Sequence, residues 1–174
     1  PSGKLPETFP IKISDTPAFG NFPGVNNQVD YAEGIYVGYH HYDAKNIEPL
    51  FPFGFGLSYS QFEYSNLKIK KLGKKTQVTF QLQNTGKMDG AEIAQLYIHD
   101  LTCSEDRPVK ELKSFEKVFL KVGETKTISM TLNDSEFEMF SKVQNKWIVE
   151  KGEFEVLIGS SSRDIKLKDR LFLK

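Results

Sequence analysis

Cysteine is almost absent from this 174-residue sequence, which contains only Cys103. One thiol can form neither an internal disulfide framework nor a multi-cysteine metal site. Net charge is absent too, because 23 basic residues balance 23 acidic ones. Without a basic surplus the chain has no field to hold nucleic acid or an anionic membrane surface. No apolar run approaches the length that crosses a bilayer. The sequence therefore predicts neither a nucleic-acid nor a membrane partner.

The composition changes near residue 61. Seven of the eight prolines precede this position, and the first part carries three lysines against six acidic residues. From residue 62 onward, 20 basic residues meet 17 acidic ones. Because the first part lacks the periodicity of a core, we expect residues 1–61 to be an extended segment that packs on a larger body, with one short strand around Tyr31–Val37. Its opening residues, Pro1–Pro6, have no signal-peptide core, and we expect the natural chain to begin upstream.

Residues 62–174 alternate like half-buried strands. Apolar residues take every second position in several runs, among them Val78–Leu82, Ile128–Leu132 and Phe154–Ile158. Turn residues such as Asn, Asp and Gly separate the runs. This spacing predicts an antiparallel β-sandwich of about seven or eight short strands. Residues 147–156 predict a hairpin that turns at Lys151-Gly152, and Asn133 predicts the start of one helical turn.

Two of the expected strands carry apolar residues on both faces. In residues 91–99, Ile93 and Tyr97 oppose Ala94, Leu96 and Ile98; residues 112–120 repeat the pattern with two phenylalanines on the second face. A strand that is apolar on both faces must be covered twice. We therefore expect one sheet of the sandwich to pack its outer face against another body.

The stretch from Tyr31 to Phe62 interleaves aromatic residues with glycine and proline, a composition that does not form a regular helix. If it is extended, Phe51, Phe53 and Phe55 lie on one side. Gly54 and Gly56 then leave the other side bare, where another backbone can approach. The sequence predicts an aromatic anchor between the β domain and a neighbouring domain.

Few residues suggest catalysis or metal binding. His40 and His41 are adjacent, and in an extended segment neighbouring side chains point to opposite faces, so they would not share a metal. We interpret them as loop histidines and Cys103 as an incidental thiol in a polar loop. Ser58, Ser60 and Ser160–Ser162 lack the glycine pattern of a nucleophile elbow and are interpreted as turn residues. The sequence thus predicts no catalytic residue, no metal site and no cofactor.

Carboxylates beside aromatic rings raise the question of sugar chemistry, because glycoside hydrolysis needs two carboxyl groups that flank one bond. The acids in or next to the aromatic stretch are Asp30, Glu33, Asp43 and Glu48. For Glu33 two interpretations remain open. It either contacts substrate or, as we favour, bonds backbone or an arginine of a neighbouring domain.

The motifs together resemble the C-terminal region of glycoside hydrolase family 3, the β-glucosidase-like enzymes. The resemblance rests on Glu33–Tyr39 and Phe51–Tyr59, and it extends over nearly the whole chain through Pro1–Pro6, Phe19–Gly24, Asn84–Gly86, Asp89-Gly90, Gln95–Tyr97 and Arg107–Lys113. It implies a fibronectin type III-like (immunoglobulin-like) β-sandwich at 62–174. Residues 1–61 would be the tail of an α/β sandwich domain plus an aromatic-rich linker. The chain departs from the family pattern at His40 and His41, where an arginine and an aromatic residue are usual.

The same resemblance implies that the catalytic pair lies elsewhere. In this family the nucleophilic Asp belongs to an N-terminal barrel, within a Ser-Asp-Trp-like motif, and the acid/base Glu to the middle α/β domain. Neither position maps onto this sequence, and Ser14-Asp15-Thr16 is not that motif. The implied parent reaction is the hydrolysis of terminal β-linked sugars, with retention, through a covalent glycosyl-enzyme.

Two functions remain open at this point. In the favoured one the chain is a noncatalytic portion that supports the upstream catalytic domains of the same enzyme. In the other it is an independent carbohydrate-binding or adhesive β-sandwich. Carbohydrate is a candidate partner in both. The candidate contacts with a substrate cleft or a neighbouring domain are Glu33, Tyr36, Tyr39, Phe53 and Phe55.

Overall fold

The computed structural model describes residues 1–174 and is dominated by strands. Two short helical elements, η1 (Ile13–Asp15) and α1 (Tyr39–Ala44), precede the first strand. The elements that follow are β1 (Phe62–Leu72), β2 (Lys75–Asn84), β3 (Gly90–Asp100), β4 (Glu111–Leu120), β5 (Thr125–Asn133), η2 (Asp134–Phe137), β6 (Met139–Ser141), β7 (Lys146–Ile148), β8 (Gly152–Gly159) and β9 (Ile165–Leu173). No helix is long and apolar enough to span a membrane.

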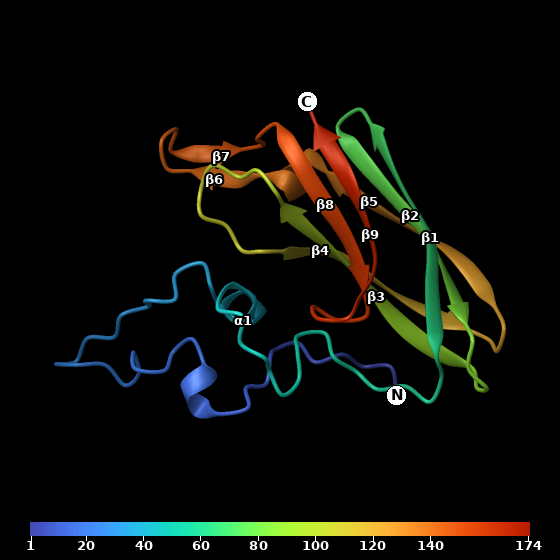
Figure 1. Ribbon diagram of the computed structural model, residues 1–174, viewed down its shortest axis with the longest axis horizontal. Helices are drawn as coiled ribbons and strands as arrows, with labels where there is room; N and C mark the ends of the chain where they lie inside the picture. The colour runs from blue at the N-terminus through green and yellow to red at the C-terminus, as the bar shows by residue number, and fades with distance from the viewer.

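Seven of these strands form an antiparallel β-sandwich, as predicted. One sheet has the order β1-β2-β5 and the other the order β4-β3-β8-β9. The two sheets stack face to face, and the chain termini lie at opposite ends of the sandwich (Figure 1). The predicted helical turn after Asn133 is also present, as η2.

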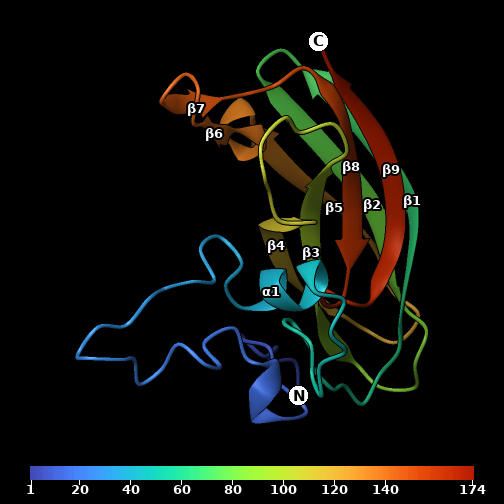
Figure 2. The same ribbon diagram turned by 60° about the vertical axis from the view of Figure 1, so that its left-hand side comes forward.

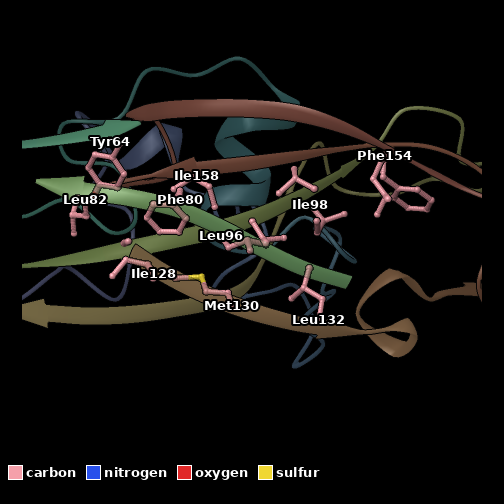
Figure 3. Packing of buried hydrophobic residues seen from close by; sticks show 14 of the residues in the cluster. Tyr64, Phe80, Leu82, Leu96, Ile98, Ile128, Met130, Leu132, Phe154 and Ile158 are labelled. Carbon is pink, nitrogen blue, oxygen red and sulfur yellow. The ribbon is translucent and has the colours of Figure 1, made fainter. Parts of the chain in front are cut away.

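The core lies between the two sheets and follows the alternation of the sequence. In β2 the side chains of Val78, Phe80 and Leu82 are buried, whereas the residues between them are only half-buried. Figure 3 shows Phe80 lying beside Leu96 and Ile158 of the facing sheet, which belong to the same core cluster. Because fully burying one such side chain contributes about 1.5–3 kcal/mol, this cluster of 18 buried residues holds the sheets together.

The second faces of β3 and β4 differ from each other. Tyr97, on the outer face of β3, is completely buried, because residues 39–55 of the chain itself cover it. Figures 1 and 2 show α1 lying against the outer side of β3 and β4. Farther along β4, Phe115 and Phe119 point outward and remain exposed. The body that covers the two-faced strand β3 is thus a part of this chain.

The predicted hairpin over residues 147–156 is wrong. Trp147 pairs with Phe140, so that β7 forms a small two-stranded sheet with β6, outside the sandwich. β8 instead pairs with β3 and β9, and its residues from Val156 to Gly159 are all buried. β8 is apolar on both faces, and the free energy gained by covering both faces outweighs the local turn preference of Lys151-Gly152.

Two expectations for the aromatic stretch are also wrong. Residues 31–37 form turns instead of a strand, because the Gly34 and Tyr36 amides donate to the carbonyls of Tyr31 and Glu33. The segment after Gly38 is helical, with both histidines in α1. Glycines with positive φ at positions 34 and 38 redirect the chain at these points.

Phe51, Phe53 and Phe55 do not lie on one side either. The chain turns at Phe53-Gly54, so that Phe51 packs on Phe55 with ring centroids 5.0 Å apart, whereas Phe53 stacks on Tyr39. A positive φ of 79° at Gly54 makes this turn possible. The predicted close approach does occur at Gly56, where a Cβ atom would lie 2.6 Å from the Gly3 carbonyl oxygen.

Candidate functional site

An aromatic stack joins the segment 1–61 to the sandwich. The Tyr39 ring lies 4.8 Å from that of Phe53, nearly parallel to it, and meets the edge of the Tyr97 ring at 6.0 Å. The Leu112 amide at the start of β4 donates a hydrogen bond of 2.8 Å to the Tyr39 hydroxyl. Burial raises the pKa of Tyr39 to about 12, so this phenol stays neutral. Tyr39 and Phe53 therefore form a structural contact within the chain.

Gln95 fixes the turn at Gly54 from the sandwich side. Its buried amide donates to the carbonyl oxygens of Gly54 at 3.2 Å and Ser160 at 2.8 Å, and it accepts a hydrogen bond from the Tyr97 hydroxyl. A Cβ atom on Gly54 would lie 2.3 Å from the Gln95 side-chain oxygen. Only glycine therefore allows the turn to approach β3 this closely.

A buried ion cluster forms the second link. The carboxylate of Asp43, in α1, pairs with Lys110, which precedes β4, and with Arg163, which lies 3.0 Å away in the β8–β9 connection. Arg163 also donates to the carbonyl oxygens of Tyr42 and Ile47, each at 3.1 Å. A carboxylate that is only 4% exposed is tolerated because two cations compensate it. This cluster holds α1 on the sandwich.

A groove of 730 Å³ opens beside this contact, between residues 32–37, the loop before β4 and the β6–β7 hairpin. Tyr36 lies in its wall and donates a hydrogen bond to the Asp106 carboxylate, a bond that raises the pKa of the Tyr36 hydroxyl. Glu33 lies in the same wall, and its carboxylate forms no hydrogen bond or ion pair within the chain. The groove rim carries the exposed rings of Phe140 and Trp147.

The five predicted contact residues thus fall into three places. Tyr39 and Phe53 lie in the aromatic stack, and Glu33 and Tyr36 lie in the groove. Phe55 packs on Phe51 and bonds the Leu5 amide through its carbonyl oxygen. Whether any of them contacts substrate or another domain stays a prediction.

Other polar candidates have structural surroundings. The His40 ring packs on the edge of the Tyr39 ring at 4.2 Å, and His41 packs on Tyr42 at 5.5 Å. No group of three or more His, Cys, Asp or Glu side chains is arranged to hold a metal ion. Cys103 is half-buried, and burial raises the pKa of its thiol, which disfavours the reactive thiolate.

The sequence analysis did not identify Gln95, Lys110 and Arg163 as residues that hold the segment 1–61 in place. Asp43 and Lys110 are 67 positions apart, and no local motif connects them. The one signal available was the two-faced pattern of residues 91–99, which indicated a covered outer face but not its polar partners.

Comparisons with known proteins agree with this architecture. Residues 92–162 match the fibronectin type III-like domain family. The chain is 53% identical over 173 residues to thermostable β-glucosidase B of Acetivibrio thermocellus, a match that covers 97% of this chain and 23% of that protein. It is 43% identical to an exo-α-(1→6)-L-arabinopyranosidase of Bifidobacterium breve, covering 95% of this chain and 22% of the relative.

Solved structures show the same similarity. The GH3 β-glucosidase of Bifidobacterium adolescentis superposes with a TM-score of 0.95 at 42% identity, over 99% of this chain and 26% of that structure. A β-glucosidase of Kluyveromyces marxianus superposes with a TM-score of 0.96 at 40% identity, over 100% of this chain and 21% of the other. The chain spans about a quarter or less of the length of these relatives. It corresponds to the C-terminal region of family 3 glycoside hydrolases of the β-glucosidase type, including their fibronectin type III-like domain.

Proposed function

We propose that this chain is the noncatalytic C-terminal portion of a β-glucosidase-type hydrolase and that it supports the upstream catalytic domains. The observation that carries this proposal is the large apolar surface of residues 1–61. This segment leaves many large apolar side chains exposed, among them Ile11, Ile13, Phe19, Phe22, Val25, Val29 and Tyr31. Apolar patches of this extent mark surfaces that another body covers.

The other face of the same segment is already occupied. The stack of Tyr39 on Phe53 and the ion cluster at Asp43 attach it to the sandwich, whereas the exposed apolar side chains take no part in these contacts. A segment with one attached face and one open apolar face fits between two domains. The sandwich then holds the segment in the conformation that the upstream domain meets.

The parent reaction that we propose is hydrolysis of terminal glycosidic bonds, with the sugar preference set upstream. Relatives named as β-glucosidases and as arabinopyranosidases are similarly close to this chain, at 45% and 43% identity. A region that is shared by enzymes of different named specificity does not itself select the sugar. This sharing favours a structural role for the chain, as a support for the catalytic domains.

The experiment compares one substitution in two proteins. Tyr31 is 83% exposed here, so Tyr31→Ser should leave the melting temperature of the 174-residue chain unchanged. In the full-length parent the same change should lower it, because there the ring is expected to be covered. Val143, which is 92% exposed on the β6–β7 connection, provides the matched control: Val143→Ser should be neutral in both.

A second measurement tests the absence of catalysis. The purified 174-residue protein should not hydrolyse an aryl β-glucoside, because the family's catalytic pair does not map onto it. Turnover that persists through further purification would overturn the proposal. An unchanged melting temperature of the parent carrying Tyr31→Ser would remove the supporting role.

A further inference from the structure

The β6–β7 hairpin carries an aromatic pair that the sandwich does not use. Trp147 is 65% exposed and Phe140 is 42% exposed, and their ring centroids are 5.8 Å apart at an angle of 73°. Both side chains lie at the groove of 730 Å³ described above. Neither ring belongs to the buried core of the sandwich. Packing of the fold therefore does not account for them.

The hairpin is held rigidly over the groove. The Lys142 amide donates to the Glu105 carboxylate at 2.9 Å, and the Ser104 amide donates to Glu150 at 2.9 Å, so the β6–β7 turn and the segment after β7 are both tied to the loop before β4. Beneath it the buried Arg107 guanidinium donates to the carbonyl oxygens of Phe137 and Glu138, each at 3.3 Å. A ring that is fixed before binding loses little conformational entropy when a ligand stacks on it.

Hydrogen-bonding groups with unused capacity converge on the same groove. The carboxylates of Glu33 and Glu138 and the ammonium group of Lys142 have no partner within the chain, and one oxygen of Glu105 is free. By contrast, Arg107 is saturated by Glu111, Asp100 and two carbonyl groups. The free groups are mostly acceptors, and they suit a ligand that offers hydroxyl donors.

We propose that this groove binds carbohydrate, with Trp147 as the stacking platform and the groove carboxylates as acceptors for sugar hydroxyls. A sugar ring has an apolar face for the indole and a rim of hydroxyl groups for Glu33 and Glu105. The volume lies within the roughly 300–1,000 Å³ that small-ligand sites occupy. The choice of a sugar over other hydroxyl-bearing ligands rests on the proposed function, which places the chain in a glycosidase.

A cationic ligand is the competing occupant, because the groove carries five acidic side chains (Glu33, Glu105, Asp106, Glu111 and Glu138) against Arg107 and Lys142. The ion pairs of Arg107 and Lys113 with Glu111 neutralise part of this charge internally. The dependence of binding on ionic strength distinguishes a neutral sugar from a cationic ligand. Binding of a neutral sugar should be nearly independent of ionic strength, whereas binding of a cation should weaken as salt rises.

The test uses the fluorescence of Trp147, the only tryptophan in the chain. Cellotetraose and laminaritetraose are titrated into the 174-residue protein at two salt concentrations, with spermidine as the cationic probe. We expect a saturable change in emission with an oligosaccharide, unaffected by salt, and no change with spermidine. Phe140→Ala and Glu105→Gln should each weaken the binding by about threefold to tenfold.

Trp147→Ala and Trp147→Phe extend the test to calorimetry and to affinity electrophoresis in gels that contain β-glucan. The alanine variant should lose about tenfold or more in affinity, and the phenylalanine variant should retain most of it. Phe115→Ala, which removes an equally exposed ring from β4, is the control and should bind normally. Melting temperatures of all variants establish that they are folded.

Three outcomes would overturn the proposal: no oligosaccharide binds, spermidine binds instead, or Trp147→Ala binds sugar as tightly as the unmodified chain. None of them affects the supporting role, which depends on Tyr31 in the parent enzyme. Conversely, a neutral Tyr31→Ser variant in the parent together with sugar binding at Trp147 would leave an independent carbohydrate-binding module. The two proposals therefore fail separately.

Discussion

Asp43 forms the ion pairs that attach α1 to the sandwich. Its carboxylate lies between Lys110 and Arg163, and all three side chains are largely shielded from water. Asp43→Ala should lower the free energy of unfolding of the 174-residue chain by about 3–5 kcal/mol, because it leaves Lys110 without its carboxylate partner and Arg163 with only the exposed Glu48. Urea denaturation measures the loss.

Glu48 offers a matched control for Asp43. It also faces Arg163, at 3.9 Å, but its side chain is 79% exposed. Glu48→Ala should cost less than about 1 kcal/mol, as exposed ion pairs do. Equal losses for the two variants would show that the cluster does not secure α1.

His40 predicts a pH dependence of stability. Both ring nitrogens are buried without a hydrogen-bond partner, and burial lowers the pKa of His40 below its ordinary value of 6.5. Below pH 6.5 the unfolded chain therefore takes up the proton before the folded chain does. Stability should fall as the pH decreases from 6.5 toward the folded-state pKa. Urea unfolding at pH 7.5 and 5.5 measures the change.

The variant His40→Gln isolates this contribution from that of the other titrating groups. It should lose less stability than the unmodified chain between the two pH values, because glutamine does not titrate. An identical pH dependence in both proteins would mean that His40 is not the group responsible.

At the scale of elements, the end of β2 is tied to the facing sheet through Asn84. Its buried amide donates to the carbonyl oxygens of Met88 at 2.8 Å and Leu120 at 3.1 Å, and it accepts from the Gly86 amide at 3.0 Å. Asn84→Ala leaves several buried groups unpaired and should cost about 2–4 kcal/mol by urea denaturation.

The control for Asn84 is a second amide on the same strand. Gln77 donates to Ser129 at 3.1 Å near the surface, where water can replace the bond. Gln77→Ala should cost less than about 1 kcal/mol. If both variants lose the same stability, Asn84 has no special role in joining the two sheets.

At the scale of the whole molecule, the chain should divide into parts of unequal stability. We predict slow amide exchange at Val78–Leu82 and Phe154–Ile158, in the centres of the two sheets, and fast exchange over residues 1–27. The Leu5 and Phe9 amides, which donate to the carbonyl oxygens of Phe55 and Phe51, should be slower than their neighbours. Uniformly slow exchange across the chain would contradict a division near residue 61.

The β-sandwich could be predicted from the local pattern of residues 62–174. The alternation in β2, β5 and β8 predicted strands, because the period of two is a local property that any covering sheet satisfies. It also identified the covered outer face of β3 from Ile93 and Tyr97. The same kind of local pattern wrongly predicted a hairpin at Trp147. Which strands pair with β7 and β8 depends on how β8 packs into the core, and a local pattern does not record this.

The attachment of residues 1–61 and the position of the groove became apparent only in the folded chain. Asp43 pairs with Lys110 and Arg163, and Glu33 lines the same groove as Trp147. Both arrangements join residues that are far apart in the sequence. The turns at Gly34 and Gly54 bring these segments together, and nothing in the periodicity of the stretch encodes their direction. A strand records its own buried face in its sequence, whereas a site that is made by three separate segments exists only once the chain has folded.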